Sequence, residues 1–104
     1  MLTKLQQIIE MAQKNDPKVV AVAAAEDEPV LESLKEAVLE GFIVPTLIGD
    51  LEKINEISKA IDFDISNFKL IDEKNPLRAA KAAVSEVRNG NADFIMKGFV
   101  STAG

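Results

Sequence analysis

Val19-Val20-Ala21-Val22-Ala23 is the stretch that decides the fold, because its apolar residues follow one another without polar alternation. A strand of this kind is buried on both faces, as in a parallel sheet. Similar apolar runs begin near Val44, Lys69 and Phe94, so successive runs start 25 residues apart. Each interval between them has helical periodicity. The pattern predicts an α/β fold: one domain over residues 1–104, with an open parallel sheet of about four strands between flanking helices in three αβα layers.

Four helices are expected from their end signals and apolar spacing. They cover residues 3–14, Pro29 to just before Gly41, the stretch after Asp50 up to Ile61, and the stretch from Pro76 to Asn89-Gly90. Caps are predicted at Thr3, Asp50 and Asn75. The apolar stripes are Leu5, Ile8, Ile9 and Ala12; Val30, Leu34, Ala37 and Val38; Leu51, Ile54, Ile57 and Ile61; and Ala79, Ala80, Ala83, Val84 and Val87. The connection at residues 62–68 is expected to pack over the core through Phe63, Ile65 and Phe68.

Composition excludes several classes of function. The chain of 104 residues has 17 acidic and 12 basic residues and a net charge of −5, which argues against nucleic acid as the main partner. Cysteine and histidine are both absent, so no disulfide framework, thiolate metal site or histidine base is expected. The first residues are not expected to form a signal peptide, since their apolar residues are spaced, and no apolar stretch reaches membrane-spanning length. A cytoplasmic globular protein without a membrane partner or a metal is therefore predicted.

Polar segments follow each predicted strand, at the edge where open parallel sheets bind their ligands. They are residues 24–28, 49–50, 72–75 and 97–104. The first three are acidic. The last contains Lys97 beside Gly98, with Ser101 and Thr102 behind, and these groups can hold an anion at the start of a helix.

A structural role is open for each of these polar residues. Acidic residues 26–28 precede a helix, where carboxylates favour the positive end of the dipole, and Asp72 is an acidic residue at a strand end. Lys97 must bring its ammonium either to the rim or to a partner, because an isolated buried charge is costly. Ser101 and Thr102 are also ordinary helix caps, and Gly98 can serve a turn. Arg78, near the start of the fourth helix, is a weaker candidate for the rim.

Three segments in order resemble the phosphate butyryltransferases and the related phosphate acetyltransferases. They are residues 18–27 (KVVAVAAAED), residues 44–50 (VPTLIGD) and residues 92–98 (ADFIMKG), with Ser101-Thr102 behind the last. The resemblance runs from Lys18 to Gly104. No Gly-rich dinucleotide fingerprint, Walker-type phosphate loop or Gly-x-Ser-x-Gly elbow competes with it.

The resemblance implies an enzyme that moves an acyl group between coenzyme A and inorganic phosphate, and butyryl is the acyl group expected. It implies the first domain of an isocitrate/isopropylmalate dehydrogenase-like fold, and a chain that is the N-terminal part of a longer two-domain enzyme. Lys97, Gly98, Ser101 and Thr102 are expected to contact substrate. No catalytic residue is carried over, because the groups usually assigned to catalysis lie beyond the matching part. The partners implied are acyl-CoA and phosphate, with no tightly bound cofactor; a homo-oligomer is expected, and the chain alone should be inactive.

A different class of function remains open beside this one. In a flavodoxin-like or receiver-like signalling module, Glu26 and Asp27 would follow the first strand, Asp72 would follow the third, and Lys97 would lie later. The layout lacks the further βα unit and the hydroxyl residue before lysine that a receiver would need. Phosphorylation of Asp72 by a small phosphodonor in the presence of magnesium would support this alternative.

Overall fold

The computed structural model describes residues 17–97, and its four strands start where the apolar runs predict. The elements in chain order are β1 (Lys18–Ala23), α2 (Glu28–Leu39), β2 (Ile43–Gly49), α3 (Leu51–Ala60), β3 (Lys69–Asp72), α4 (Pro76–Arg88) and β4 (Phe94–Lys97). The expected helix over residues 3–14 lies outside the described residues. Among residues 17–97, no helix is both long enough and apolar enough to cross a membrane.

The strands form one parallel sheet in the order β3-β2-β1-β4. The chain therefore builds outward from β1 through β2 to β3 and then returns to the other side of β1. Pro45 lies in β2 one residue before the pairing with β3 begins at Thr46, so it precedes the part of β2 that is paired on both sides. The open parallel sheet is confirmed.

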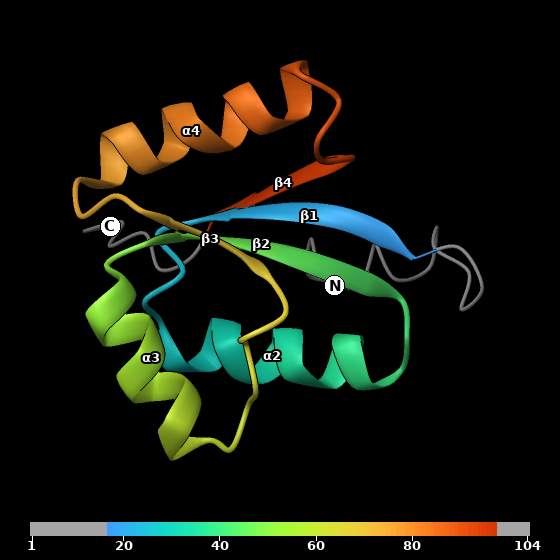
Figure 1. Cartoon of the computed structure of the whole chain (residues 1–104), viewed down its shortest axis with the longest axis vertical. Helices are drawn as coiled ribbons and strands as arrows, with labels where there is room; N and C mark the ends of the chain where they lie inside the picture. Colours follow the sequence, from blue (N-terminus) through green and yellow to red (C-terminus); the bar gives the residue numbers. More distant parts are fainter. Residues whose placement is uncertain (1–16, 98–104) are drawn as a thin grey trace, which may run out of the picture.

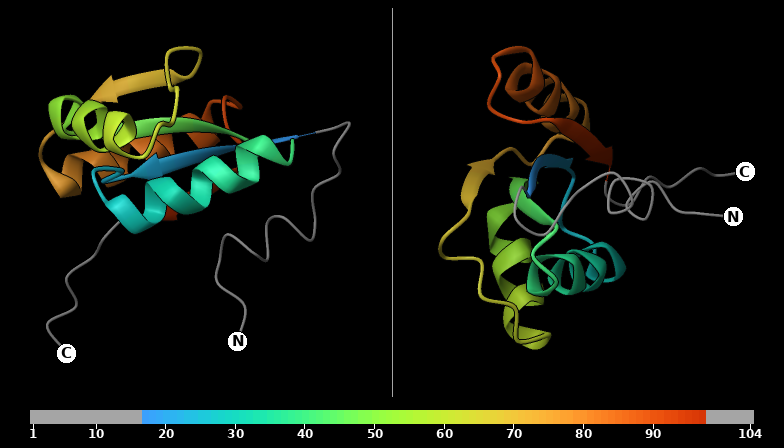
Figure 2. Two further views of the ribbon diagram at one scale, coloured as in Figure 1. Left: turned by 90° about the horizontal axis from the view of Figure 1, so that it is seen from below. Right: turned by 90° about the vertical axis from the view of Figure 1, so that its right-hand side faces the viewer.

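Helices cover both faces of the sheet. Figure 1 shows α4 on one face and α2 with α3 on the other, and the end-on view of Figure 2 shows the same three layers. This αβα arrangement confirms the prediction. The first strand lies between β2 and β4, which explains why its residues from Val20 to Ala23 are buried without polar alternation.

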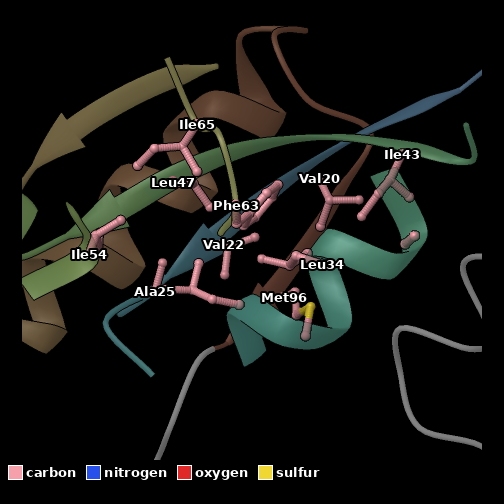
Figure 3. Close-up of a cluster of buried hydrophobic side chains, with 12 residues drawn as sticks. Val20, Val22, Ala25, Leu34, Ile43, Leu47, Ile54, Phe63, Ile65 and Met96 are labelled. Carbon is pink, nitrogen blue, oxygen red and sulfur yellow. The ribbon is translucent and has the colours of Figure 1, made fainter. Parts of the chain in front are cut away.

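The face covered by α2 and α3 holds the large side chains of the core. Leu31 and Leu34 from α2 are fully buried, as are Leu47 from β2 and Ile54 from α3. Figure 3 shows part of this cluster, with Phe63 and Ile65 of the predicted 62–68 connection packed into it. The stripe predicted for α2 missed Leu31, which is buried more completely than the predicted Val30 and Val38.

The face covered by α4 is lined mainly by small residues. Ala79 and Ala83 pack on Ala21 and Ala23 of β1, so the helix lies close to the sheet. Including Val84 in this buried stripe was wrong, because its side chain is 43% exposed. The following turn of α4 instead buries Glu86.

Glu86 is a charged residue on the buried side of α4. Its carboxylate forms an ion pair of 2.6 Å with Lys69 at the start of β3 and accepts a hydrogen bond from Asn91. These two partners hold the pKa of Glu86 below its usual range, the lysine hydrogen bond contributing most. The ion pair joins the end of α4 to the edge strand, at the amino ends of the strands.

Candidate functional site

The carboxyl ends of the four strands meet at one edge, where the sequence predicts a ligand site. The register puts Ala23 opposite both Ile48 and Lys97, and Gly49 opposite Asp72. The loops that follow β1, β2 and β3 gather at this edge (Figure 1). It divides into a half over β2 and β3 and a half over β1 and β4.

Over β2 and β3, the amino end of α3 is occupied by the protein's own carboxylates. The amide N–H of Asp50 donates to Glu26 Oε2 at 3.1 Å, and that of Lys53 donates to Asp50 Oδ1 at 3.4 Å. The amide of Leu51 makes a longer contact of 3.5 Å with Asp72 Oδ1. Amides at a helix start would otherwise attract an anionic ligand. Here the amides of residues 50, 51 and 53 are already used.

Two backbone hydrogen bonds connect the loops of this half. Ala25 donates from its amide to the carbonyl of Ile48 at 3.0 Å, and Glu73 donates to the carbonyl of Gly49 at 2.9 Å. Glu26 also lies against Gly49, because a Cβ built on Gly49 would collide with Glu26 Oε1. The three loops are therefore joined by hydrogen bonds into one connected surface.

The other helix starts are capped in the same way. Asp27 Oδ1 accepts from the amide of Val30 at 3.0 Å, which makes it the N-cap of α2. Asn75 Oδ1 accepts from the amides of Leu77 and Arg78, as its predicted capping role requires. The structural role is thus observed for Asp27, Asp50 and Asn75.

Over β1 and β4, the edge differs in charge and in backbone shape. Lys97 ends β4 with an exposed side chain, and its ammonium has no ion pair or hydrogen bond with another described residue. Next to its partner Ala23, Ala24 adopts a φ of 54°, in the left-handed region that costs a non-glycine residue of order 1–3 kcal/mol. Strands β2 and β3 lie on one side of β1 and β4 lies on the other, so the strand order changes direction between β1 and β4, which is the topological switch point of the sheet. Ligands of open α/β sheets bind at such a point.

Of the predicted substrate contacts, the structure describes only Lys97. Gly98, Ser101 and Thr102 lie outside the described residues. Glu26 has a role that the sequence did not predict, since it reaches the start of α3 across 24 residues rather than the start of α2. The glycine that directly follows the apolar run of β2 was the available signal, because a glycine at a strand end permits a close approach.

No metal centre is formed by the described part of the chain. Among residues 17–97, no group of three or more His, Cys, Asp or Glu side chains could hold an ion. An open groove of about 570 Å³ lies away from the carboxyl edge, between the end of α3, the 62–66 segment and Leu70 of β3. Its position separates it from Lys97, so it is not part of the candidate site.

The fold and this edge define a doubly wound α/β domain with a cationic switch point. The chain belongs to the family described as Phosphate acetyl/butaryl transferase, whose model matches residues 3–85. It is 48% identical over 86 residues to a phosphate butyryltransferase of Clostridium beijerinckii, covering 83% of this chain and 28% of that protein. It is 40% identical over 103 residues to a phosphate butyryltransferase of Clostridium acetobutylicum, covering 99% and 34%.

Other relatives carry the acetyl name or share the fold. A phosphate acetyltransferase of Thermotoga maritima is 37% identical over 98 residues, covering 94% of this chain and 33% of that protein. The EutD phosphotransacetylase from Staphylococcus aureus has a similar structure, with a TM-score of 0.66 at 18% identity over 96% of this chain and 38% of that chain. This chain spans about a third of the length of these curated relatives.

These findings confirm the predicted family and the α/β fold. The likeness to the first domain of isocitrate/isopropylmalate dehydrogenases is not tested by them and stays a prediction. The receiver-like alternative is not favoured, since the family match covers most of the chain. The engagement of Glu26 with α3 also removes one of the acids that this alternative needed.

Proposed function

We propose that residues 1–104 form the N-terminal part of a longer two-domain phosphate acyltransferase, which transfers a butyryl group between coenzyme A and inorganic phosphate. One observation carries the proposal: an exposed lysine at the switch point of a chain that is 48% identical to a phosphate butyryltransferase. The two more similar relatives named above both carry the butyryl name, which favours butyryl over acetyl.

In this proposal Lys97 holds a phosphate oxygen through its ammonium group. Gly98, Ser101 and Thr102 follow it in sequence and would supply backbone amide and hydroxyl donors to the same anion. A phosphate oxygen attacks the thioester carbonyl, a C–O bond forms, the C–S bond breaks, and coenzyme A leaves as the thiolate. Holding the two reactants together accounts for much of the rate enhancement.

One lysine does not balance the charge of phosphate and coenzyme A. The edge over β2 and β3 is acidic, and its carboxylates are directed at backbone amides. The rest of the enzyme would therefore supply guanidinium groups for the phosphate and for the oxyanion that develops at the carbonyl. We propose no tightly bound cofactor, a homo-oligomeric cytoplasmic enzyme, and no activity for the 104-residue chain alone.

The test is a chimera in which this chain replaces the matching segment of the Clostridium beijerinckii phosphate butyryltransferase. Coenzyme A release from butyryl-CoA and phosphate should persist in the chimera. Lys97→Ala should lower kcat/KM by about tenfold to a hundredfold, the range expected for a hydrogen bond from a charged donor. Lys81→Ala is the matched control, because Lys81 is exposed on α4 and should leave the rate unchanged. Equal rates for both variants would exclude Lys97 from the site.

The chain by itself provides a second test. Assayed with butyryl-CoA and phosphate, it should release no coenzyme A above the uncatalysed rate. Turnover comparable to that of the chimera would contradict the proposal that this chain forms only part of the cleft.

A further inference from the structure

Glu26, at the carboxyl edge, has a carboxylate of which only one oxygen is hydrogen-bonded within the described residues. Its Oε2 accepts from the amide of Asp50, while its Oε1 is buried and has no hydrogen-bond partner among the described residues. A buried carboxylate oxygen without a partner is unfavourable, so another constraint must keep the side chain in place. The absence of a Cβ at Gly49 provides the space in which this oxygen lies.

The contact with Asp50 determines the direction of the loop after β1. Ala24, at φ 54°, redirects the chain directly after the strand. Ala25 then bonds to Ile48, and Glu26 bonds to Asp50, so two successive residues fasten the loop to β2 and to the start of α3. Lys97 lies on the opposite side of β1 from β2. The loop is thus held toward the neighbour of β1 that does not carry the lysine.

We infer that Glu26 is a positioning residue that latches the β1–α2 loop over β2 and keeps the switch point beside Lys97 open to an anionic ligand. The loop contains Glu26 and Asp27, and Glu28 begins α2, so a released loop can bring a carboxylate to the ammonium of Lys97. That carboxylate would compete with phosphate. The inference rests on the proposed function in taking Lys97 as the anion site.

Two variants at this position separate the latch from other roles. Glu26→Ala removes the acceptor for the Asp50 amide and also removes a negative charge. Glu26→Gln removes the same charge but keeps an oxygen that can accept from Asp50. A residue that acted only by repelling anions would give tighter phosphate binding in both variants. A latch gives weaker binding in Glu26→Ala alone.

The experiment is a titration of the isotope-labelled 104-residue chain with inorganic phosphate, followed by the amide chemical shift of Lys97. If release makes the open state a tenth of the population, the dissociation constant of Glu26→Ala rises about tenfold. The constant of Glu26→Gln should stay within about twofold of the unchanged chain. Hydrogen exchange at the Asp50 amide should accelerate in Glu26→Ala and not in Glu26→Gln, which reports the latch without any ligand.

Asp50→Ala is the matched control for lost stability. It removes the side-chain cap of α3 at Lys53, yet the backbone amide of residue 50 that bonds to Glu26 remains. Its phosphate affinity, measured on the folded protein, should equal that of the unchanged chain. An equal loss of affinity in Asp50→Ala and Glu26→Ala would show that general destabilisation, not the latch, weakens binding.

The outcomes distinguish this inference from the function on which it rests. If the unchanged chain shows no phosphate-dependent shift at Lys97, the latch inference falls, while the chimera with Lys97→Ala still decides the proposed function. If it binds phosphate and Glu26→Ala binds equally well or more tightly, the latch is wrong while the anion site stands. Unchanged exchange at the Asp50 amide in Glu26→Ala would overturn the latch even if phosphate affinity fell.

Discussion

Over β2 and β3 the carboxyl edge of the sheet is filled by the protein's own acids, whereas over β1 and β4 it presents the exposed Lys97 beside the left-handed Ala24. Both halves contain loops that begin at the ends of parallel strands. They differ because the amide donors of the first half are satisfied by Glu26, Asp50 and Asp72. We call the first the closed half, because its amide donors are used by the protein's own acids, and the second the open half, because its described residues present a cation without such partners.

Gly49→Ala should affect the closed half most strongly. The new Cβ would collide with Glu26 Oε1 and lie 3.1 Å from the backbone nitrogen of Ala25. Because the loop is bonded on both sides of this point, we expect a loss of about 2 kcal/mol in the free energy of unfolding, typical of overpacking. Urea unfolding of the two proteins measures this loss.

Gly90→Ala is the control for backbone strain without a collision. Gly90 has a φ of 77°, and a Cβ there would meet no atom within 4 Å. It should therefore lose only the cost of a left-handed alanine, about 1 kcal/mol. In a Glu26→Ala background Gly49→Ala should become less damaging, since the collision is then absent. Additive losses in that double variant would mean that Glu26 is not what Gly49 accommodates.

Asp50→Ala should have a smaller effect on the same half. It removes the N-cap of α3 but leaves the contacts of Glu26 and Asp72 with that helix start. We expect a loss of about 1 kcal/mol in the free energy of unfolding, as for other capping residues. Glu52→Ala, an exposed first-turn change outside the capping bonds, should cost under about 0.5 kcal/mol. A larger loss for Glu52→Ala would place the stabilising charge in the helix and not in its cap.

The sequence predicted the strands and helix caps of the closed half, but not the contact that joins its loops. The spacing of the apolar runs fixed the strand starts, and local caps such as Asp50 and Asn75 were found because a cap and its amide lie within three residues of each other. The contact of Glu26 with Asp50 spans 24 residues, so no local pattern contains it. It arises only when β1 and β2 pair in the observed register.

The burial of α4 shows the same limit. Alanines at helical spacing predicted a close approach to the sheet, and Ala79 and Ala83 confirm it. Val84 is apolar and is predicted on that side, whereas the apolar pattern does not include the charged Glu86. The buried Glu86 pairs with Lys69, which β3 brings to it from 17 residues earlier in the chain. Side-chain type alone could not predict that pair.

The Lys69–Glu86 ion pair provides a pH test at the amino edge, away from both halves. The folded-state pKa of Glu86 is lowered, so its contribution is present above the ordinary glutamate pKa and is lost as pH falls through the lowered value. Lys69 is half exposed, and solvent screening keeps the contribution under about 1 kcal/mol. Glu86→Gln should therefore destabilise the chain at neutral pH and have less effect in acid.

Glu32→Gln is the matched control for this titration, since Glu32 is exposed on α2. Urea unfolding at neutral pH and at a pH below the ordinary glutamate value of about 4.3 should show a pH-dependent difference from the unchanged chain for Glu86→Gln only. If the carboxyl edge alone determined acid sensitivity, the two variants would behave alike.

Ala24→Gly tests the open half and has the smallest expected effect. Glycine relieves the left-handed strain at φ 54°, worth about 1 kcal/mol or more, but it adds freedom to the unfolded chain worth about 0.5–1 kcal/mol. The net result should be a gain of about 0.5 kcal/mol in the free energy of unfolding. Ala25→Gly, at a fully buried neighbour, should instead lose about 1 kcal/mol, because glycine gains nothing there and leaves a void. A gain in the free energy of unfolding for Ala24→Gly and a loss for Ala25→Gly would show that the backbone at the switch point is strained, and that glycine would be the more stable residue at position 24. Equal losses would mean that Ala24 is held by packing, and that the two halves of the edge do not differ in backbone strain.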